Sequence, residues 1–438
     1  MEINELYQLY LQSGKVTTDS RQVEPGSMFF ALRGDNFDGN QFAAAALEKG
    51  AAYAVVDDPA VAKSGSFILV DDVLLTLQQL ARFHRRQFLI PVIGITGSNG
   101  KTTTKELISA VLASHYNTHY TRGNLNNHIG VCLTLLAMPL NTEVAVIEMG
   151  ANAQGEIAAL CRIAEPTHGL ITNIGKAHLE GFGGLEGVKK GKSELYRFLS
   201  ENRSTAFINT DEPFLEELSA GVSKRVAYCL SEDPAPDHQP YEVKLLETQP
   251  FLKVAFLGET GDIIDVQTNL IGRYNLGNLM SAIALGKYFK VPALKIKAAI
   301  EAYVPRMNRS QITSWGTNTI IMDAYNANPS SMEQALLNFS SMEARRKVAI
   351  LGDMFELGAE SPAEHQRIAA LAKAQPYDLL ILVGEHFSEP AQQLDVQHFG
   401  TVNTLKEWFG QQRWERTCFL LKGSRGMQLE KLLVGIGD

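Results

Sequence analysis

A glycine-rich loop between a buried strand and a helix constrains the fold of this chain more than any other feature. The apolar run VIGIT (92–96) predicts a strand, and KTTTKELISAVLASHY (101–116), with apolar spacings of three and four, predicts a helix. Glycines let the backbone between them curl so that N–H groups point at a phosphate, and the helix N-terminus adds partial positive charge. The loop therefore predicts a nucleotide site in a parallel α/β unit. Its residues are Gly97, Ser98, Asn99, Gly100, Lys101, Thr102 and Thr103.

Lysine and threonine at the end of this loop define its chemistry. Lys101 supplies a full positive charge to the β- and γ-phosphates, and the Thr102 hydroxyl can ligate Mg²⁺. The generic P-loop pattern has a glycine at the position of Ile95, so that pattern is not met in full. The alternative is a tight turn with a chance lysine, but the order of strand, glycine loop, Lys-Thr and helix favours a phosphate site.

An acid and a histidine follow other predicted strands, at the edge where parallel sheets place their sites. Glu148 closes VAVIEMG (144–150) and can share a Mg²⁺ ion with Thr102. His178 follows GLITNI (169–174) and can hold a second metal or a substrate oxygen. The alternatives are a strand-end carboxylate that contacts only water and a histidine with a structural role.

Chain length and patterning predict an α/β protein of three domains. The chain has 438 residues, which is too many for one hydrophobic core, so two to four domains are expected. Apolar strand-like runs alternate with helical segments, which favours parallel sheets covered by helices. We predict a small α/β N-terminal domain (1–86), a central P-loop parallel-sheet ATPase domain (87–305) and a Rossmann-like α/β C-terminal domain (306–438).

Two regions add detail to this prediction. A Pro/Asp-rich loop at 231–240 precedes the alternating segments FLKVAFLG and DIIDVQTNL, which predict a small antiparallel β insert in the central domain. Four apolar runs in the C-terminal domain predict strands that are each followed by a helix. They are TIIMDAY (319–325), KVAILGD (347–353), DLLILVG (378–384) and TCFLLKG (417–423).

Composition excludes several functional classes. The 40 basic and 48 acidic side chains give a net charge of −8, so the surface does not attract nucleic acid or anionic lipid. The short basic run at Arg82, Arg85 and Arg86 predicts a solvated helix face. Four separated cysteines predict neither a disulfide framework nor a zinc site. Without a basic leader or a bilayer-spanning apolar stretch, we expect a cytoplasmic protein with no membrane insertion.

Five sequence blocks occur together in the order typical of one enzyme family. By these blocks the chain resembles the Mur ligase family, the ATP-dependent amide-bond-forming enzymes of peptidoglycan precursor synthesis. The resemblance covers essentially the whole chain, and the blocks together are far more specific than any one of them. They are TGSNGKTTTKE (96–106), NLNNHIG (124–130), IEMGAN (147–152), TNIGKAHLEGFG (172–183) and GRYNLGNLMSA (272–282).

Four further segments resemble one branch of this family. The first is similar to an N-terminal domain that binds a UDP-sugar, and the other three are similar to the C-terminal domain of that branch. The Asp-Asn-Pro-Arg block of the members that add diaminopimelate is absent. The segments are TTDSRQVEPGSMFFALRGDNFDGNQF (17–42), DAYNANPSSM (323–332), LGDMFELG (351–358) and LKGSRGM (421–427).

The resemblance implies an activity, its partners and its cofactors. An ATP-dependent ligase would join D-alanyl-D-alanine to UDP-N-acetylmuramoyl-tripeptide through an acyl phosphate, releasing ADP and phosphate. Both substrates are small molecules, no nucleic acid takes part, and we expect a monomer. ATP and Mg²⁺ are the implied cofactors, because fixed positive charge must offset the repulsion between a carboxylate and a triphosphate.

The resemblance also assigns residues to the metal ions. Lys192, in GKSELY, matches the family position at which a lysine is carbamylated, and its carbamate would help to hold the second Mg²⁺ near His178. Thr102 and Glu148 would hold the first Mg²⁺ with the ATP phosphates. The alternative for Lys192 is an ordinary exposed lysine, since Lys190 lies close by.

Other residues are assigned to the nucleotide. Asn275 and Asn278, one turn apart, match the adenine-side block, with helix capping as the alternative. Arg306 stands in Val-Pro-Arg where the family commonly has Gly-Arg, and the resemblance gives it the family's role. Asp323 and Tyr325 open the third domain and are expected to reach the nucleotide across a cleft, which implies domain closure.

The substrate residues are expected in the outer two domains. Ser424 and Arg425 follow the last strand and are expected near the incoming dipeptide, whose carboxylate an arginine would pair with. A structural salt bridge is the alternative for Arg425. Asn326 is expected at the substrate, beside Tyr325. The candidates for the uridine end are Ser20, Arg21, Asn36 and Asn40.

Three alternatives stand beside this reading. The nearest is another ligase, such as a different Mur ligase or a folylpolyglutamate synthase, which the 17–42 segment and the C-terminal segments disfavour. The second is a phosphotransferase or switch NTPase that uses the same loop without forming an amide. The third is an inactive nucleotide-binding scaffold, which we would expect to have lost Lys101, Glu148 or Lys192.

Overall fold

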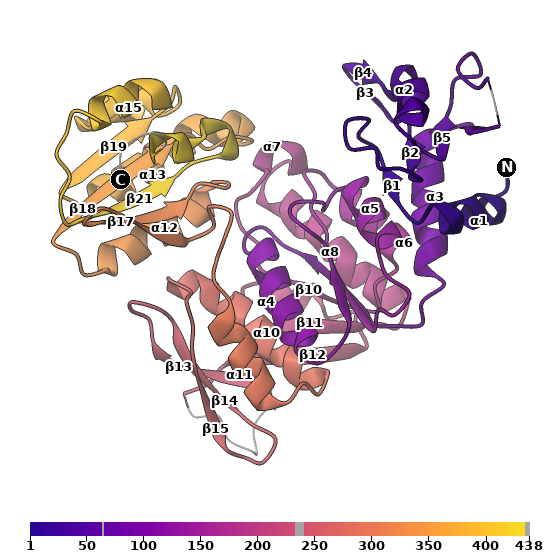
Figure 1. Ribbon diagram of the computed structural model, residues 1–438. Coiled ribbons are helices and arrows are strands. Elements are labelled where there is room, and N and C mark those ends of the chain that lie inside the picture. Colours follow the sequence, from indigo (N-terminus) through magenta and orange to yellow (C-terminus); the bar gives the residue numbers. More distant parts are fainter. Residues whose placement is uncertain (64, 233–240, 434–438) are drawn as a thin grey trace.

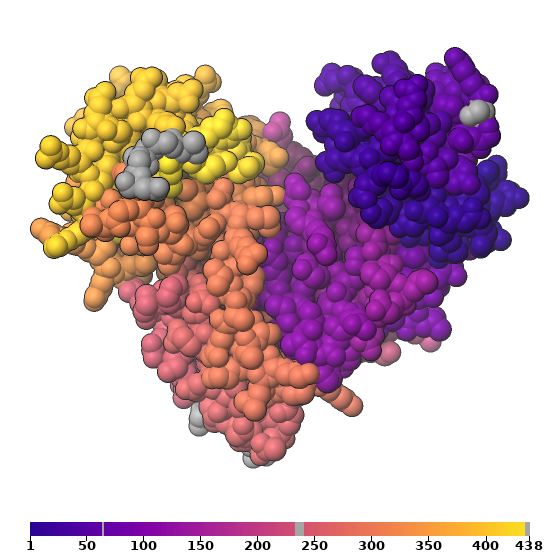
Figure 2. Space-filling model, viewed as in Figure 1, coloured from indigo at the N-terminus to yellow at the C-terminus, as the bar shows by residue number. Residues whose placement is uncertain are grey.

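The computed structural model describes residues 1–63, 65–232 and 241–433, which form three α/β units, each built on its own sheet (Figure 1). This confirms the predicted fold class. The N-terminal and C-terminal units stand apart on either side of the central unit (Figure 2). Among the described residues, no helix is long and apolar enough to cross a bilayer.

The N-terminal unit has a four-stranded parallel sheet, in the order β1-β2-β5-β6, and a two-stranded hairpin, β3-β4. The strands are β1 Val16–Thr17, β2 Met28–Phe30, β3 Arg33–Gly34, β4 Phe37–Asp38, β5 Tyr53–Val56 and β6 Phe67–Leu69. The helices are α1 Ile3–Ser13, α2 Ala43–Glu48 and α3 Val73–Arg85.

Buried polar contacts join this unit to the central one. The Tyr10 hydroxyl donates to the Leu136 carbonyl at 2.6 Å. The predicted solvated face of α3 is wrong for Arg85, which is 6% exposed and donates to the carbonyls of Phe88, Ala164 and Glu165 at 2.9–3.1 Å. Its guanidinium therefore binds the C-terminal end of a central helix, where carbonyls lack intrahelical partners.

The central unit has a nine-stranded sheet, in the order β15-β14-β13-β12-β11-β10-β7-β9-β8, that is parallel from β8 to β13. Its strands are β7 Val92–Thr96, β8 Thr118–Tyr120, β9 Val144–Glu148, β10 His168–Ile171, β11 Thr205–Asn209, β12 Lys224–Leu230, β13 Glu242–Glu247, β14 Lys253–Leu257 and β15 Ile263–Gln267. Its helices are α4 Lys101–Ala113, α5 Gly130–Leu136, α6 Glu156–Ala164, α7 Leu179–Phe182, α8 Leu185–Glu201, α9 Leu215–Leu218, α10 Leu276–Tyr288 and α11 Ala293–Ala302.

The predicted antiparallel insert is confirmed. β13, β14 and β15 pair antiparallel and continue the sheet of the central unit. The junction is a parallel pairing of Cys229 with Glu242 and of Leu230 with Val243. Of the Pro/Asp-rich loop predicted at 231–240, residues 233–240 lie outside the described part of the chain.

The C-terminal unit has a six-stranded sheet, in the order β16-β17-β21-β18-β19-β20, with only β16 antiparallel to its neighbour. The four predicted strands are confirmed, but β16 and β20 were missed, and short 3₁₀ turns follow β21 where a helix was predicted. The strands are β16 Gln311–Trp315, β17 Asn318–Asp323, β18 Arg346–Gly352, β19 Leu379–Val383, β20 Gln397–Phe399 and β21 Thr417–Lys422. The helices are α12 Pro329–Ser341, α13 Ser361–Lys373, α14 Ser388–Leu394 and α15 Val402–Phe409.

Candidate active site

A cleft of about 940 Å³ lies between the central and C-terminal units. It is lined by the ends of β9 and β17 and by the loops that follow β7, β9 and β17, the edge where parallel sheets bind ligands. No residue of 1–86 is among the described residues that line it. The predicted site residues that line it are Ser98, Asn99, Gly100, Lys101, Thr102, Thr103, Glu148, His178, Asn275, Asn278, Asp323, Tyr325 and Asn326.

The predicted phosphate loop requires both of its glycines. Gly97 and Gly100 have φ values of +143° and +78°, a region that side chains rarely adopt. A Cβ atom on Gly97 would lie 1.9 Å from the Thr172 hydroxyl, and one on Gly100 would lie 2.3 Å from the Asn278 side-chain oxygen. The loop is therefore packed on both sides, and any larger residue would displace it.

The N–H groups of the loop divide into two sets. Those of Ser98 and Asn99 donate to the backbone and side-chain oxygens of Asn173 at 3.0 and 2.9 Å, which fixes the first half of the loop. Those of residues 101–103 form the first turn of α4, where N–H groups have no intrahelical acceptor. These last residues line the cleft, so they are the N–H donors suited to a phosphate.

Lys101 folds back over the loop. Its Nζ donates to the carbonyls of Gly97 and Ser98 at 2.7 and 3.1 Å. Burial lowers the pKa of Lys101 to about 8, against an opposing effect of Glu148, and the charge of Arg309 lowers it further. The ammonium thus lies in a water-poor site where its charge acts strongly on a bound phosphate.

Glu148 has the surroundings expected of a metal ligand. The residue is 1% exposed, and its Oε1 accepts from the Thr102 hydroxyl at 3.1 Å and from the Asn126 amide at 2.8 Å. Its Oε2 is buried and has no hydrogen-bond partner, with Lys105 Nζ at 3.7 Å. A buried carboxylate oxygen in this state, beside a hydroxyl, fits a Mg²⁺ ion.

The described residues contain no group of three or more His, Cys, Asp or Glu side chains able to hold a metal. A cation between Thr102 and Glu148 would therefore take its other ligands from phosphate and water, which is usual for Mg²⁺.

Lys192 is buried, which contradicts the alternative of an ordinary exposed lysine. It is 1% exposed, its Nζ donates to the Ala151 carbonyl at 3.2 Å, and it lies 4.8 Å from the centre of the Phe182 ring. Burial, followed by the charge of Lys101, holds the pKa of Lys192 well below its ordinary value. A neutral amine is the form that adds CO₂, so its surroundings suit the predicted carbamylation.

His178 precedes α7 and lines the cleft, with its Nδ1 2.5 Å from Glu356 Oε2 of the C-terminal unit. The imidazole thus lies at the junction of two units. The His178 ring lowers the pKa of Glu356, which favours a charged carboxylate there.

Asn275 and Asn278 connect α10 to the phosphate-loop helix. The Asn278 amide donates to Asn275 Oδ1 at 2.9 Å, and its Oδ1 accepts from the Thr104 hydroxyl at 2.8 Å. Asn275 occupies the N-cap position of α10 without a side-chain cap bond, and Asn278 lies inside the helix, so side-chain capping accounts for neither.

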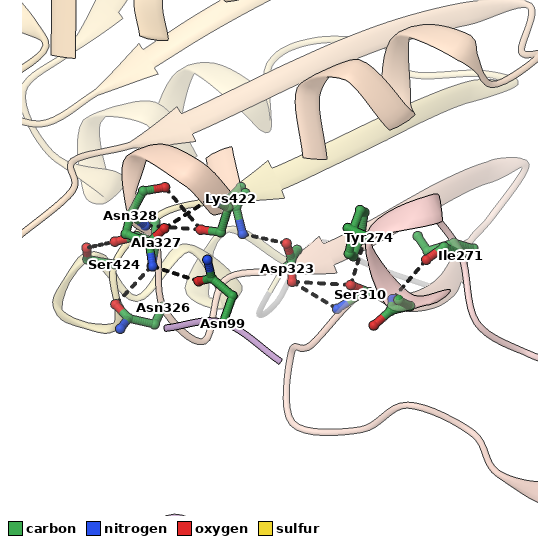
Figure 3. A network of polar contacts seen from close by, with 12 residues as sticks. Asn99, Ile271, Tyr274, Ser310, Asp323, Asn326, Ala327, Asn328, Lys422 and Ser424 are labelled. Atoms are coloured by element: carbon green, nitrogen blue, oxygen red, sulfur yellow. Dashed lines mark hydrogen bonds and ion pairs between the residues drawn. The ribbon is translucent and has the colours of Figure 1, made fainter. Parts of the chain in front are cut away.

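The C-terminal unit contributes a polar network (Figure 3). Lys422, at the end of β21, donates to Asp323 Oδ2 at 2.5 Å, and Asp323 Oδ1 accepts from the Ser310 N–H at 3.0 Å. The Asn328 amide crosses to the phosphate loop and donates to Asn99 Oδ1 at 2.7 Å (Figure 3). The central and C-terminal units are therefore in direct contact at the predicted nucleotide site.

An arginine was expected here, but the structure places a different one in the cleft. Arg306 is exposed and does not line it, whereas Arg309 does. The Arg309 guanidinium lies 3.7 Å from the centre of the Tyr325 ring, and its Nε is buried without a hydrogen-bond partner. Sequence reasoning missed Arg309 because Arg306 lies only three residues away and the glycine that precedes the family's arginine is absent.

Ser424 and Arg425 lie outside the cleft lining. Ser424 is buried, and its Oγ accepts from the Phe355 N–H at 2.9 Å. Arg425 pairs with Glu430 at 2.9 Å with 59% of its side chain exposed, which matches the salt-bridge alternative. Lys422, two residues before Ser424, was missed although it lies in the LKGSRGM segment.

The predicted uridine residues lie in the N-terminal unit, away from the cleft. Arg21 is exposed and pairs with Asp19 at 2.8 Å. Asn40 is buried, and its amide donates to Asp38 and Asp57 at 2.8 Å each, so it holds loops together. Ser20 lies in the loop after β1, and Asn36 is exposed between β3 and β4.

Comparison with known proteins agrees with this geometry. Profiles described as Mur ligase catalytic domain, Mur ligase middle domain and Mur ligase, glutamate ligase domain match residues 14–85, 95–286 and 306–425. The UDP-N-acetylmuramoyl-tripeptide–D-alanyl-D-alanine ligase of Bacillus subtilis is 36% identical over 433 residues, which cover 95% of this chain and 92% of the relative.

Solved structures agree as well. A crystal structure of MurF from Acinetobacter baumannii aligns with a TM-score of 0.84 and 30% identity over 98% of both chains. The MurF ligase of Thermotoga maritima in complex with ADP shares the fold, with a TM-score of 0.82 and 24% identity over 97% of both chains. The three α/β units, the phosphate-loop cleft between two of them and these similarities lead to one conclusion: the chain belongs to the Mur ligase family.

Proposed function

We propose that this chain is an ATP-dependent ligase that joins D-alanyl-D-alanine to UDP-N-acetylmuramoyl-tripeptide and so forms a pentapeptide precursor of peptidoglycan. The related enzyme of Bacillus subtilis is named for this reaction, and the similarity extends over nearly the whole of both chains. The Thermotoga maritima MurF ligase was solved with ADP, which supports ATP as the co-substrate.

One observation carries the proposal: the phosphate loop and Glu148, whose buried Oε2 has no hydrogen-bond partner, line the cleft, and the buried amine of Lys192 donates to the carbonyl of Ala151, which lines the same cleft. A phosphate loop alone indicates only nucleotide binding. A switch NTPase has no evident use for a buried neutral lysine beside that loop, whereas a ligase with a carbamate does.

The chemistry requires an anionic carboxylate to approach a triphosphate. In the proposed reaction the peptide carboxylate attacks the γ-phosphate, ADP leaves, and the dipeptide amine displaces phosphate from the resulting acyl phosphate. Lys101, Arg309 and the N-terminus of α4 supply positive charge that is already in place in the cleft. Mg²⁺ held by Thr102 and Glu148 would add further charge against the phosphate oxygens.

The remaining predictions extend this proposal. Asn275, Asn278, Asp323 and Tyr325 would contact the nucleotide, since all four line the cleft. The uridine end would bind the N-terminal domain (1–86), and the dipeptide would bind near Ser424 and Arg425 of the C-terminal domain (306–438). A cytoplasmic location and a monomeric state remain predictions.

The assay that tests the function is ADP release with UDP-N-acetylmuramoyl-tripeptide, with and without D-alanyl-D-alanine. The proposal expects ADP release that depends on the dipeptide, together with the pentapeptide product by mass spectrometry. A phosphotransferase or switch NTPase would release phosphate at the same rate without the dipeptide. Another amide ligase would respond to a different amine, such as glutamate or diaminopimelate.

Carbamylation of Lys192 has a separate test. With ¹³C-bicarbonate, the parent protein should show a carbamate carbon signal by NMR, because the buried amine is neutral enough to add CO₂. Lys192→Ala should lose the signal, and Lys190→Ala, which removes an exposed lysine two residues away, should keep it. Equal signals in the two variants would contradict the assignment.

A further inference from the structure

The loop from Asp353 to Glu360, between β18 and α13, faces the central unit; we call it the docking loop. We propose that Glu356 on this loop is a positioning residue that fixes the His178 imidazole at the cleft when the C-terminal unit lies on the central unit. The inference rests on the proposed ligase reaction for its kinetic readout.

The contact itself determines which nitrogen of His178 faces the cleft. His178 Nδ1 lies 2.5 Å from Glu356 Oε2 in a close ion-pair contact without hydrogen-bond geometry, and the imidazole lines the cleft with 19% of its side chain exposed. With Nδ1 at the carboxylate, Nε2 is the nitrogen left to bind a cation or a substrate oxygen. A carboxylate close to one ring nitrogen restricts the orientation of the ring and keeps the other nitrogen directed at a ligand.

The docking loop holds Glu356 in this position through its own unit. Glu356 has a φ of +63°, an unfavourable value for a residue with a side chain. The residues before it are anchored: the Met354 N–H donates to His365 Nε2 at 3.0 Å, and the Phe355 N–H donates to the Ser424 hydroxyl at 2.9 Å. The position of the Glu356 carboxylate is therefore set by contacts within the C-terminal unit and does not depend on His178.

The same loop fits closely against the segment that carries His178. The Glu180 N–H donates to the Glu356 carbonyl at 3.4 Å. Gly358, at φ +55°, lies so near that a Cβ atom there would be 3.1 Å from the Glu180 Cβ. The contact with His178 therefore forms only when the two units are docked, which couples the orientation of the imidazole to closure.

Docking alone does not explain this pair. The interface already contains an ion pair between Lys176 and Glu364, and the Glu356 side chain is 54% exposed. Exposed pairs contribute little to stability. If Glu356 only stabilised the interface, neutralising it would leave metal binding and ligation at the cleft unchanged. If Glu356 positions His178, neutralising it would weaken both.

The experiment compares Glu356→Gln and Glu356→Asp with two matched controls in the full-length protein. Glu360→Gln neutralises an exposed acid at the end of the docking loop, and Glu364→Gln breaks the other interface pair without touching His178. Two quantities are measured: Mn²⁺ binding by electron paramagnetic resonance, with an ATP analogue and UDP-N-acetylmuramoyl-tripeptide present, and kcat and KM for ligation.

Glu356→Gln should lower both kcat and Mn²⁺ affinity by about 10- to 100-fold, the usual effect of removing the partner of a ligating histidine, with KM for ATP nearly unchanged. Glu356→Asp should restore part of both, and Glu360→Gln should equal the parent. Parent values in Glu356→Gln, or equal losses in Glu364→Gln, would overturn the proposal. If the parent itself ligates nothing, the proposed function fails, and the Mn²⁺ comparison still decides the role of Glu356.

Discussion

Two lysines of the central unit, Lys101 and Lys192, show how burial adapts one residue type to two tasks. The pKa of Lys101 is lowered to about 8 by burial, partly offset by Glu148, so it remains a cation near neutral pH. Burial, and then the charge of Lys101, holds the pKa of Lys192 well below its ordinary value. Burial thus leaves Lys101 a cation suited to phosphate and favours the amine form of Lys192.

Lys101 has a direct test. Lys101→Ala should reduce ADP release by about 100-fold or more, because it removes a preorganised charge aimed at the transferred phosphate. Lys105, one turn further along α4, cannot replace it, because its Nζ faces Glu148 at 3.7 Å. Lys190→Ala, at an exposed site, should behave as the parent. A Lys101→Ala enzyme that ligates at the parent's rate would contradict the phosphate role.

His168, remote from the cleft at the start of β10, should make stability depend on pH. Burial, and then the charge of Lys224, lowers its pKa to about 4 from the ordinary 6.5. Between these values the unfolded chain binds a proton that the folded chain does not, so the contribution is present above pH 6.5 and is lost as pH falls toward 4.

Denaturant unfolding at pH 7.5 and pH 5 measures this effect. Between the two values the parent should lose about 2 kcal/mol more stability than His168→Gln, which cannot titrate. Other buried histidines contribute equally to both proteins. The same pH dependence in both proteins would show that His168 binds a proton as well in the folded chain as in the unfolded chain.

Single residues mark the limit of what the sequence could predict. Lys101, Thr102 and Glu148 were placed correctly in the cleft, because a strand, a turn and a helix determine where such residues point. Arg306 was predicted for the cleft, but Arg309 lines it. The two arginines are three residues apart, and tertiary packing, which the local sequence does not reveal, decides which of them faces the cleft. Asn40 was predicted for ligand binding, but its amide bonds to two aspartates of its own unit.

At the scale of elements, buried parallel strands were the easiest to predict. All five residues of β7, of β9 and of β11 are buried, so each appears as a short, mostly apolar run. β16, QITSW, is an edge strand with no buried position, and β20 has three residues, so neither carries that signal. The central sheet continues from β12 to β13 by a parallel pairing. These two strands are separated in sequence by residues 233–240, so local sequence patterns do not predict that they pair.

The attachment of α3 to α6 gives a prediction at this scale. Arg85→Met should destabilise the protein by about 2–3 kcal/mol, because it removes charge-assisted bonds to three carbonyls in a buried site. Arg82→Met, which breaks a half-exposed pair with Glu165, should cost less than about 1 kcal/mol. Equal unfolding midpoints for the two variants would show that the carbonyls are satisfied by water when Arg85 is absent.

Across the whole molecule, the two interfaces of the central unit differ in kind. The N-terminal unit joins it through buried groups such as Tyr10 and Arg85. The C-terminal unit joins it through polar contacts that include Asn99 with Asn328 at the cleft and Lys176 with Glu364 outside the cleft lining. Because partly exposed pairs contribute little, we expect the C-terminal unit to separate in solution and to close on its ligands.

Small-angle scattering tests this closure. The radius of gyration should fall when an ATP analogue and both substrates are added together, because the phosphates bind groups from both units. Lys101→Ala, which weakens nucleotide binding, should contract less at the same concentrations. An unchanged scattering curve for the parent would mean that the units are already docked without ligand.

The rigid junction between α3 and the central unit has a consequence for substrate choice. With the uridine bound at the N-terminal unit, as we propose, the span from that sheet to Lys101 does not vary as the third unit swings. The part of the substrate between its uridine and its terminal carboxylate must therefore be as long as this distance. If the peptide were one residue shorter, its terminal carboxylate would not extend to the phosphate loop, even with the uridine end fully bound. The enzyme would therefore select its peptide substrate by length.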